Sequence, residues 1–293
     1  MNPIIEKILA RGPVVTDGAW GTQLQARGLE PGECPDAWNL SRPEKVEEIA
    51  RAYTKAGSRI ILTNTFGANR ITLAKYGLAE KAAEINRQGA TISQRGTGGQ
   101  ALVFASIGPT GKMLLMGEVE EEELRAAFAE QAQALKEGGA DGLVVETMSD
   151  PAEAKVAVAA ARETGLPVVG CMSFDSGKNK DRSMMGTTIE QAVEALTEAG
   201  ADVIGANCGQ GIEGYIHICQ RLRAAASLPI WIKANAGLPE IENGRTVYKR
   251  KPEEFAAWIP ELLKSGASFI GGCCGTSPEF IKAVKKALAA ALP

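Results

Sequence analysis

The sequence predicts an α/β protein, a single-domain (β/α)8 TIM barrel that spans residues 1–293. Two observations predict this fold. Eight short runs of β-branched and apolar residues have the length of buried parallel strands, and stretches of helix-forming composition separate them. The runs recur at intervals of roughly 25 to 45 residues, which is the spacing of repeated strand and helix units around a barrel. An open doubly wound sheet is the alternative arrangement of the same elements.

Four of the eight predicted strands follow a glycine that ends the preceding helix. In each case a small residue follows the glycine and an apolar run begins, in the segments 56–64, 139–146, 200–207 and 266–273. Glycine readily adopts the left-handed conformation that terminates many helices. Four further apolar runs fit buried parallel strands, at residues 14–17, 102–106, 167–171 and 229–234.

Helical periodicity and composition fill the stretches between these runs. The pattern predicts helices over 123–137, 151–164, 189–198, 211–226 and 252–264. The acidic run from Glu120 to Glu123 indicates a helix start, because carboxylates stabilise the positive end of a helix dipole. The glycine-rich stretch 96–100 reads as a loop, and no low-complexity linker divides the chain. One domain is therefore expected.

Charge and hydropathy exclude several classes of partner. The formal net charge is -3, from 32 basic and 35 acidic residues, and no run of Lys and Arg forms a stripe for phosphates. The amino terminus carries charges where a signal peptide needs an apolar core, and no run of about 18 apolar residues occurs. We therefore expect a cytoplasmic protein that binds neither nucleic acid nor membranes.

Polar, glycine or cysteine residues follow almost every predicted strand directly. In a barrel of this kind the carboxyl ends of the strands carry the chemistry, because the loops there vary without disturbing the core. Eight converging ends of this composition predict a polar rim around one site. The ends read DGA, NTFG, SIGPT, ETM, SFD, NCG, NAG and CCG in chain order.

The cysteines give the strongest single signal. Cys208 ends the sixth predicted strand, while Cys273 and Cys274 end the eighth, so the two positions are two strands apart, roughly 10 Å between strand axes. A zinc ion with bonds of about 2.3 Å to sulfur closes that gap when the side chains converge. Adjacent strand residues point to opposite faces, so Cys273 and Cys274 share a metal only if the chain has left the strand. The alternative is that all three are small buried hydrophobic residues.

The number of thiolates indicates the chemistry. Three protein ligands leave one tetrahedral position open, as in catalytic rather than structural zinc sites. Three thiolates make the zinc a poor Lewis acid for generating hydroxide. A fourth thiolate from a substrate has its pKa lowered by the metal and stays nucleophilic, which favours attack on an electrophilic carbon.

Other candidates give weaker signals. Glu146 directly follows an apolar run and suits an ammonium group, with a structural salt bridge as the alternative, and Asp17 before Gly18 either binds substrate or caps a turn. His217, the only histidine, is expected at the surface or in packing, because it falls in the helix after the sixth strand. The remaining cysteines are expected to pack in the interior, namely Cys34, Cys171 and Cys219.

These motifs resemble the homocysteine S-methyltransferase family, and most of all the amino-terminal homocysteine-binding module of cobalamin-dependent methionine synthase. The resemblance covers practically the whole chain from about Val14. It is carried by seven motifs, which begin at residues 17 (DGAWGT), 63 (TNTFGAN), 107 (IGPTG), 146 (ET), 207 (NC), 235 (NAG) and 271 (GGCCGT).

The resemblance implies a (β/α)8 barrel with one Zn²⁺ on Cys208, Cys273 and Cys274. It also implies that the amino and carboxylate groups of homocysteine are held near four positions, which are Asp17, Gly18, Ala19 and Glu146. Asn235 matches a position that occupies the fourth metal site when substrate is absent.

The methyl donor is expected to be a methylcobamide on a separate corrinoid protein that docks over the barrel mouth. Methionine synthases continue into folate, cobalamin and activation modules, whereas this sequence ends at Pro293. Members that use S-methylmethionine usually depart from the motifs at 18–22 and 63–66. Two alternatives remain, a corrinoid-independent thiol methyltransferase with a sulfonium or betaine donor and a non-catalytic zinc-binding barrel.

Overall fold

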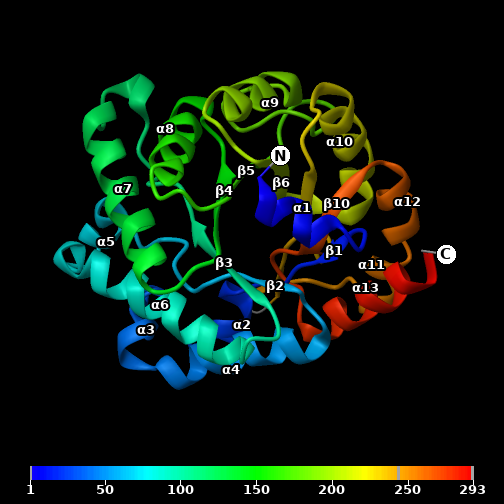
Figure 1. Cartoon of the computed structure of the whole chain (residues 1–293), viewed down its shortest axis with the longest axis horizontal. Coiled ribbons are helices and arrows are strands. Elements are labelled where there is room, and N and C mark those ends of the chain that lie inside the picture. The colour runs from blue at the N-terminus through cyan, green and yellow to red at the C-terminus, as the bar shows by residue number, and fades with distance from the viewer. Residues whose placement is uncertain (1, 243–244, 292–293) are drawn as a thin grey trace.

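The computed structural model describes residues 2–242 and 245–291 and contains the expected barrel. Eight strands pair in parallel in the order β1-β10-β7-β6-β5-β4-β3-β2, and helices surround them (Figure 1). The strands are β1 Val14–Val15, β2 Ile60–Ile61, β3 Leu102–Ile107, β4 Gly142–Met148, β5 Val168–Met172, β6 Val203–Gly211, β7 Ile230–Asn235 and β10 Ala267–Gly272. The fold class and all eight predicted strands are confirmed.

The two shortest strands, β1 and β2, complete the circle. The backbone N–H of Arg59 donates to Val15 O at 2.8 Å, and further along the N–H of Leu62 donates to the Asp17 carboxylate at 2.7 Å. A side chain therefore supplies one link that a continuous backbone ladder would provide. This arrangement places Asp17 at the seam of the barrel.

The helices that cover the barrel follow the predicted pattern with one exception. The expected helix over 252–264 is two helices, α11 Pro252–Ala256 and α12 Ile259–Lys264. Pro260 lacks the N–H that a continuous helix would need, and it suits the first turn of a new one. The other principal helices are α1 Pro3–Leu9, α4 Pro43–Ala56, α6 Ala82–Thr97, α7 Glu121–Glu137, α8 Pro151–Arg162, α9 Ile189–Glu198, α10 Ile212–Ala225 and α13 Pro278–Ala291.

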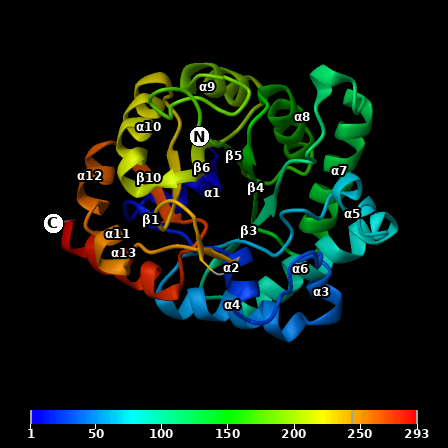
Figure 2. The same cartoon turned by 180° about the vertical axis from the view of Figure 1, so that it is seen from behind.

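The loops at the carboxyl ends of the strands carry additional elements that the sequence pattern did not predict. Short helices α2 Gly21–Gln25, α3 Trp38–Ser41 and α5 Arg70–Ala74 follow β1 and β2. An antiparallel hairpin of β8 Glu240–Glu242 and β9 Arg245–Val247 follows β7, in the segment that crosses in front of the barrel in Figure 2. Residues of α2 and α5 line the cavity at the mouth.

The opposite end of the barrel is closed by apolar packing. Helix α1 lies across this end (Figure 1), and its Ile5 and Ile8 belong to the cluster of buried residues inside the barrel. Trp231 at the centre of that cluster stacks on Phe104 with ring centroids 6.4 Å apart and contacts Phe269 at 5.2 Å. A larger core lies between the strands and the helices. None of the described helices is long and apolar enough to cross a membrane.

Candidate functional site

Three cysteine side chains converge at the mouth of the barrel. The Sγ atoms of Cys208, Cys273 and Cys274 all lie within 4.8 Å of one another, and those of Cys208 and Cys274 are 3.9 Å apart. Within the described residues this is the one group of three or more potential metal ligands of this kind. The strands β6 and β10 that carry them both flank β7, as the spacing predicted.

The backbone leaves regular strand geometry at both positions. Cys208 has a φ of 64°, and the pairing of β6 with β7 is interrupted between Asn207 and Gly211. A left-handed conformation is unfavourable for a residue with a side chain, and strained residues of this kind are enriched at functional sites. Strand β10 ends at Gly272, so Cys273 and Cys274 lie beyond it and are not bound to opposite faces. The predicted turn out of the strand is confirmed.

The three cysteine side chains shift one another's pKa values. The pKa of Cys208 is lowered well below its usual 9.0, because Cys273 and Cys274 donate hydrogen bonds to its sulfur. The same contacts, together with burial, raise the pKa of Cys273 and Cys274. Three converging cysteine sulfurs are the donor set of a soft cation site, in which the metal displaces the thiol protons.

Asn235 lies at the end of β7, between the two cysteine-bearing strands. Its Oδ1 atom is buried and accepts no hydrogen bond within the part of the chain that the structure describes. A buried carbonyl oxygen without a donor is costly. The amide group of the same side chain contacts Cys208 and helps to lower the pKa of that thiol.

Glu146 extends from β4 into the same mouth and is almost fully buried. Ser106 Oγ donates to its Oε1 at 2.5 Å, and Asn207 Nδ2 lies 3.3 Å from its Oε2. Asn207 Nδ2 also donates to Thr147 Oγ1 at 2.7 Å and lies 3.8 Å from Cys273 Sγ, so it links the carboxylate to the sulfur cluster. Burial raises the pKa of Glu146 above its usual 4.5. A cation that enters the mouth would stabilise the ionised form.

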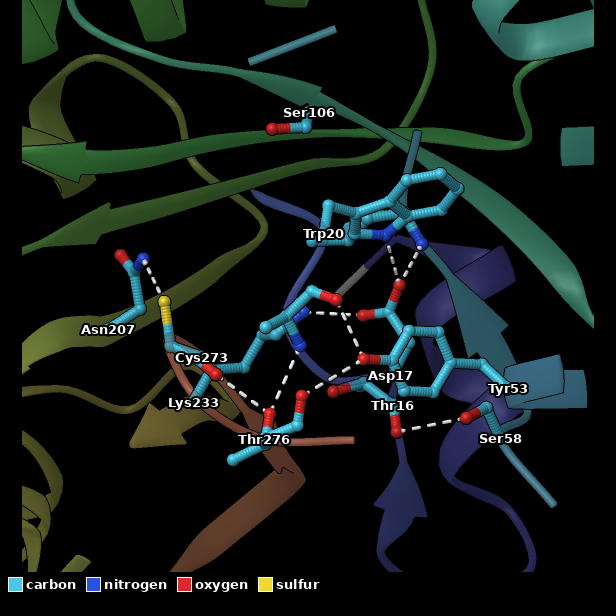
Figure 3. A network of polar contacts seen from close by, with 12 residues as sticks. Thr16, Asp17, Trp20, Tyr53, Ser58, Ser106, Asn207, Lys233, Cys273 and Thr276 are labelled. Atoms are coloured by element: carbon cyan, nitrogen blue, oxygen red, sulfur yellow. Dashed lines mark hydrogen bonds and ion pairs between the residues drawn. The ribbon is translucent and has the colours of Figure 1, made fainter. Parts of the chain in front are cut away.

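Asp17 lies below this level, in a network at the barrel seam (Figure 3). Its carboxylate accepts from Lys233 Nζ at 2.5 Å, Trp20 Nε1 at 2.8 Å and Leu62 N at 2.7 Å. The side chain is fully buried and does not line the cavity. Asp17 therefore holds the side chains of Lys233 and Trp20 and the backbone of Leu62 in position.

Gly18 and Ala19 form part of the cavity wall next to this network. A Cβ atom on Gly18 would lie 2.7 Å from the Tyr53 hydroxyl, so only glycine fits there. The N–H of Ala19 donates to Thr276 Oγ1 at 3.0 Å, and its carbonyl accepts from Tyr53 at 2.7 Å. Both backbone groups of Ala19 are therefore already hydrogen-bonded.

A cavity of about 550 Å³ joins these groups. Gly18, Ala19, Glu146 and the three cysteines line it, whereas Asp17 and Asn235 do not. A second part of the cavity extends toward Asp36, Phe66 and Tyr76. The size is in the range of small-molecule sites.

Sequence reasoning missed two polar residues of the site, Lys233 and Asp36, and it assigned no role to Asn207 although it quoted the motif at 207. Lys233 is 1% exposed and follows three apolar residues of β7. A lysine within a buried strand is unusual, and this could have indicated a functional residue. His217 is exposed on α10, and Cys34, Cys171 and Cys219 are buried, as expected.

The family model for homocysteine S-methyltransferase matches residues 14–288. The chain belongs to the homocysteine S-methyltransferase family. Two proteins that are similar to this chain are named methionine synthase. One is from Mycobacterium leprae (strain TN), at 33% identity, and the other is from Mycobacterium tuberculosis (strain ATCC 25618 / H37Rv), at 32%. Each alignment covers 96% of this chain and 25% of the relative, so the chain spans about a quarter of their length.

Two solved structures show the same fold as this chain. The metallated form of the homocysteine methyltransferase MmuM from Escherichia coli superposes with a TM-score of 0.80 at 23% identity, covering 96% of this chain and 99% of that one. Its apo form gives a TM-score of 0.74 at 21% identity, covering 97% and 99%.

Proposed function

We propose that residues 1–293 form a homocysteine-binding barrel that transfers a methyl group to the sulfur of homocysteine and so yields methionine. One zinc ion per chain would be held by Cys208, Cys273 and Cys274. The observation that carries this proposal is the convergence of three sulfurs within 4.8 Å at the mouth of a barrel of this family.

The residues present fit a zinc ion. The donor set is three cysteine sulfurs within 4.8 Å of one another, and the side chain of Asn235 contacts Cys208. Three thiolates with a neutral oxygen as fourth donor suit tetrahedral zinc. When bound, zinc would lower the pKa of a substrate thiol while its sulfur stays nucleophilic.

The protein side chains would bind and orient the amino-acid end of homocysteine. Glu146 is a buried carboxylate on the cavity wall, and an ammonium group would compensate its desolvation. Ser106 and Asn207 fix the direction of this carboxylate. Gly18 and Ala19 shape the adjacent wall, and Asp17 supports it from beneath.

The donor we propose is a methylcobamide carried by a corrinoid protein that docks over the mouth. The methyl group would form a bond to the homocysteine sulfur, and the electron pair of the broken carbon–cobalt bond would stay with the corrinoid. Two features support a carrier protein. Relatives about four times as long bear the name methionine synthase, and loops at this end of the barrel expose large apolar side chains, with Leu115 82%, Met184 72% and Ile241 72% exposed.

X-ray absorption at the zinc edge tests the metal and substrate parts of the proposal. Added homocysteine should replace an oxygen or nitrogen ligand by a fourth sulfur. An unchanged zinc spectrum would instead indicate a non-catalytic zinc-binding barrel.

Incubation with homocysteine and different donors tests the methyl source. A methylated corrinoid protein should yield methionine and demethylated corrinoid in equal amounts. Methionine formed only from sulfonium or betaine donors would contradict the corrinoid part of the proposal.

A further inference from the structure

A buried lysine occupies the floor of the cavity. Lys233 is on β7, its side chain is 2% exposed, and it lines the cavity together with Glu146 and Cys273. Burial of an ammonium group is costly unless the group is paired and hydrogen-bonded. The neighbours of Lys233 on the same strand are apolar or amide residues, so the strand itself gains nothing from this charge.

The described contacts use only part of the hydrogen-bonding capacity of Lys233. An ammonium group has three donors, and within the described residues one hydrogen-bond partner is found, Asp17 Oδ1 at 2.5 Å. Asp17 itself also accepts from Trp20 and Leu62, so its charge is stabilised by three donors. Lys233 can therefore serve a second anion without leaving Asp17 unpartnered.

Glu146 faces the same cavity but makes no ion pair with Lys233 within the 4.0 Å that defines one. An acidic and a basic group thus line one cavity with a gap between them. The register places Lys233 opposite Asn207 of β6 and Gly271 of β10, just before the metal-ligand candidates on both strands. Lys233 consequently lies one step deeper in the barrel than the sulfurs.

We propose that Lys233 binds the carboxylate of the thiol substrate while Glu146 binds its ammonium group. This inference rests on the proposed function, and it names Lys233 as the residue that selects an α-amino acid over simpler amino thiols. Each charge of the zwitterion meets a group of opposite sign, and the thiol end extends toward the cysteine cluster. A thiol without a carboxylate leaves the ammonium group of Lys233 without a second partner. The site should therefore bind an α-amino acid thiol more tightly than a simple amino thiol.

Binding of two thiols to the zinc-loaded full chain tests this assignment. The probes are homocysteine and aminopropanethiol, which is homocysteine without its carboxylate. Loss of a hydrogen bond to a charged group costs affinity by about ten- to a hundredfold. We expect the wild type to prefer homocysteine by that factor, and Lys233→Gln to lose the preference by weakening homocysteine alone. Lys264→Gln, at a lysine whose side chain is 75% exposed, is the matched control and should retain the preference.

Equal weakening of both thiols in Lys233→Gln, or no weakening of either, would overturn the assignment. Glutamine can still donate to Asp17, which favours folding of this variant. If the variant nevertheless fails to fold, the wild type decides, because homocysteine methyl ester must then bind about ten- to a hundredfold more weakly than homocysteine. Equal affinity would refute the role of Lys233. A zinc spectrum that no thiol changes would contradict the proposed function, whereas thiol binding at zinc without preference for a carboxylate would contradict only this inference.

Discussion

Asp36 is a carboxylate buried in the wall of the cavity, and its replacement by asparagine should stabilise the protein. The side chain is 5% exposed, and its Oδ1 accepts from Gly67 N at 3.0 Å. Among the described residues its Oδ2 has one hydrogen-bond partner, the Cys34 thiol at 3.9 Å. Burial raises the pKa of Asp36 from its usual 3.8 to about 6. The folded state therefore disfavours the ionised form.

The size and sign of the effect follow from this shift. The rise from 3.8 to about 6 corresponds to about 3 kcal/mol of destabilisation when Asp36 is ionised. Because the folded pKa exceeds the unfolded one, the cost is complete above pH 6 and disappears as the pH falls from about 6 to 3.8. Asp36→Asn removes the charge and keeps an acceptor for the N–H of Gly67. The gain should approach about 3 kcal/mol at pH 8 and vanish near pH 4.

Urea unfolding of the wild type and of Asp36→Asn at several pH values measures this difference. Glu80→Gln, at an exposed position, is the control and should change the free energy of unfolding by less than about 0.5 kcal/mol at every pH. A gain that does not depend on pH, or a loss of stability at pH 8, would refute the reasoning, because either result means that desolvation of the carboxylate is not the dominant effect.

Three further changes test the site. Cys208→Ala or Cys273→Ala should release zinc and abolish methyl transfer while the circular dichroism spectrum of the barrel persists, and retained turnover would disprove the metal assignment. Glu146→Gln should weaken homocysteine binding by about 1–3 kcal/mol in calorimetry. Burial raises the pKa of Glu146 above 4.5, so the wild type should begin to lose affinity at a pH higher than 4.5 as the solution is acidified. The variant should lack this pH dependence. Gly18→Ala should lower the thermal midpoint and homocysteine affinity together, since its Cβ would meet the Tyr53 hydroxyl at 2.7 Å, and an unchanged midpoint would show that this contact relaxes freely.

The sequence was informative where local pattern and tertiary structure obey the same rule. Glycines that end helices, followed by apolar runs, mark parallel strands, and these patterns were sufficient to locate all eight strands in the sequence. The polar strand ends likewise placed Cys208, Cys273 and Glu146 at one mouth. The hairpin β8–β9 escaped prediction because its strands are only three residues each and β8 is exposed, which leaves too short a pattern to recognise.

Other features depend on contacts that no local pattern contains. Lys233 sits in a run whose neighbours are buried, so periodicity alone assigns it to a strand and says nothing of its partners. Asp17 is 216 residues away from Lys233 in sequence. The two side chains meet only because the folded barrel places β1 and β7 around the same interior. The left-handed backbone of Cys208 is also set by its surroundings, since cysteine has no local preference for that conformation.

The two ends of the barrel have different roles: one end stabilises the fold, and the other contains the candidate functional site. At the amino-terminal end of the strands, α1 and the stacked rings of Trp231 and Phe104 form a wholly apolar closure. At the other end lie buried carboxylates, a buried lysine and the strained backbone of Cys208, each of which costs folding free energy. Ligands that pair with these groups would recover part of that cost, so zinc and homocysteine should each raise the thermal midpoint and should do so cooperatively. Additive shifts would mean that the sulfur cluster and the amino-acid end of the cavity are energetically independent, contrary to the link that Asn207 makes between Glu146 and Cys273.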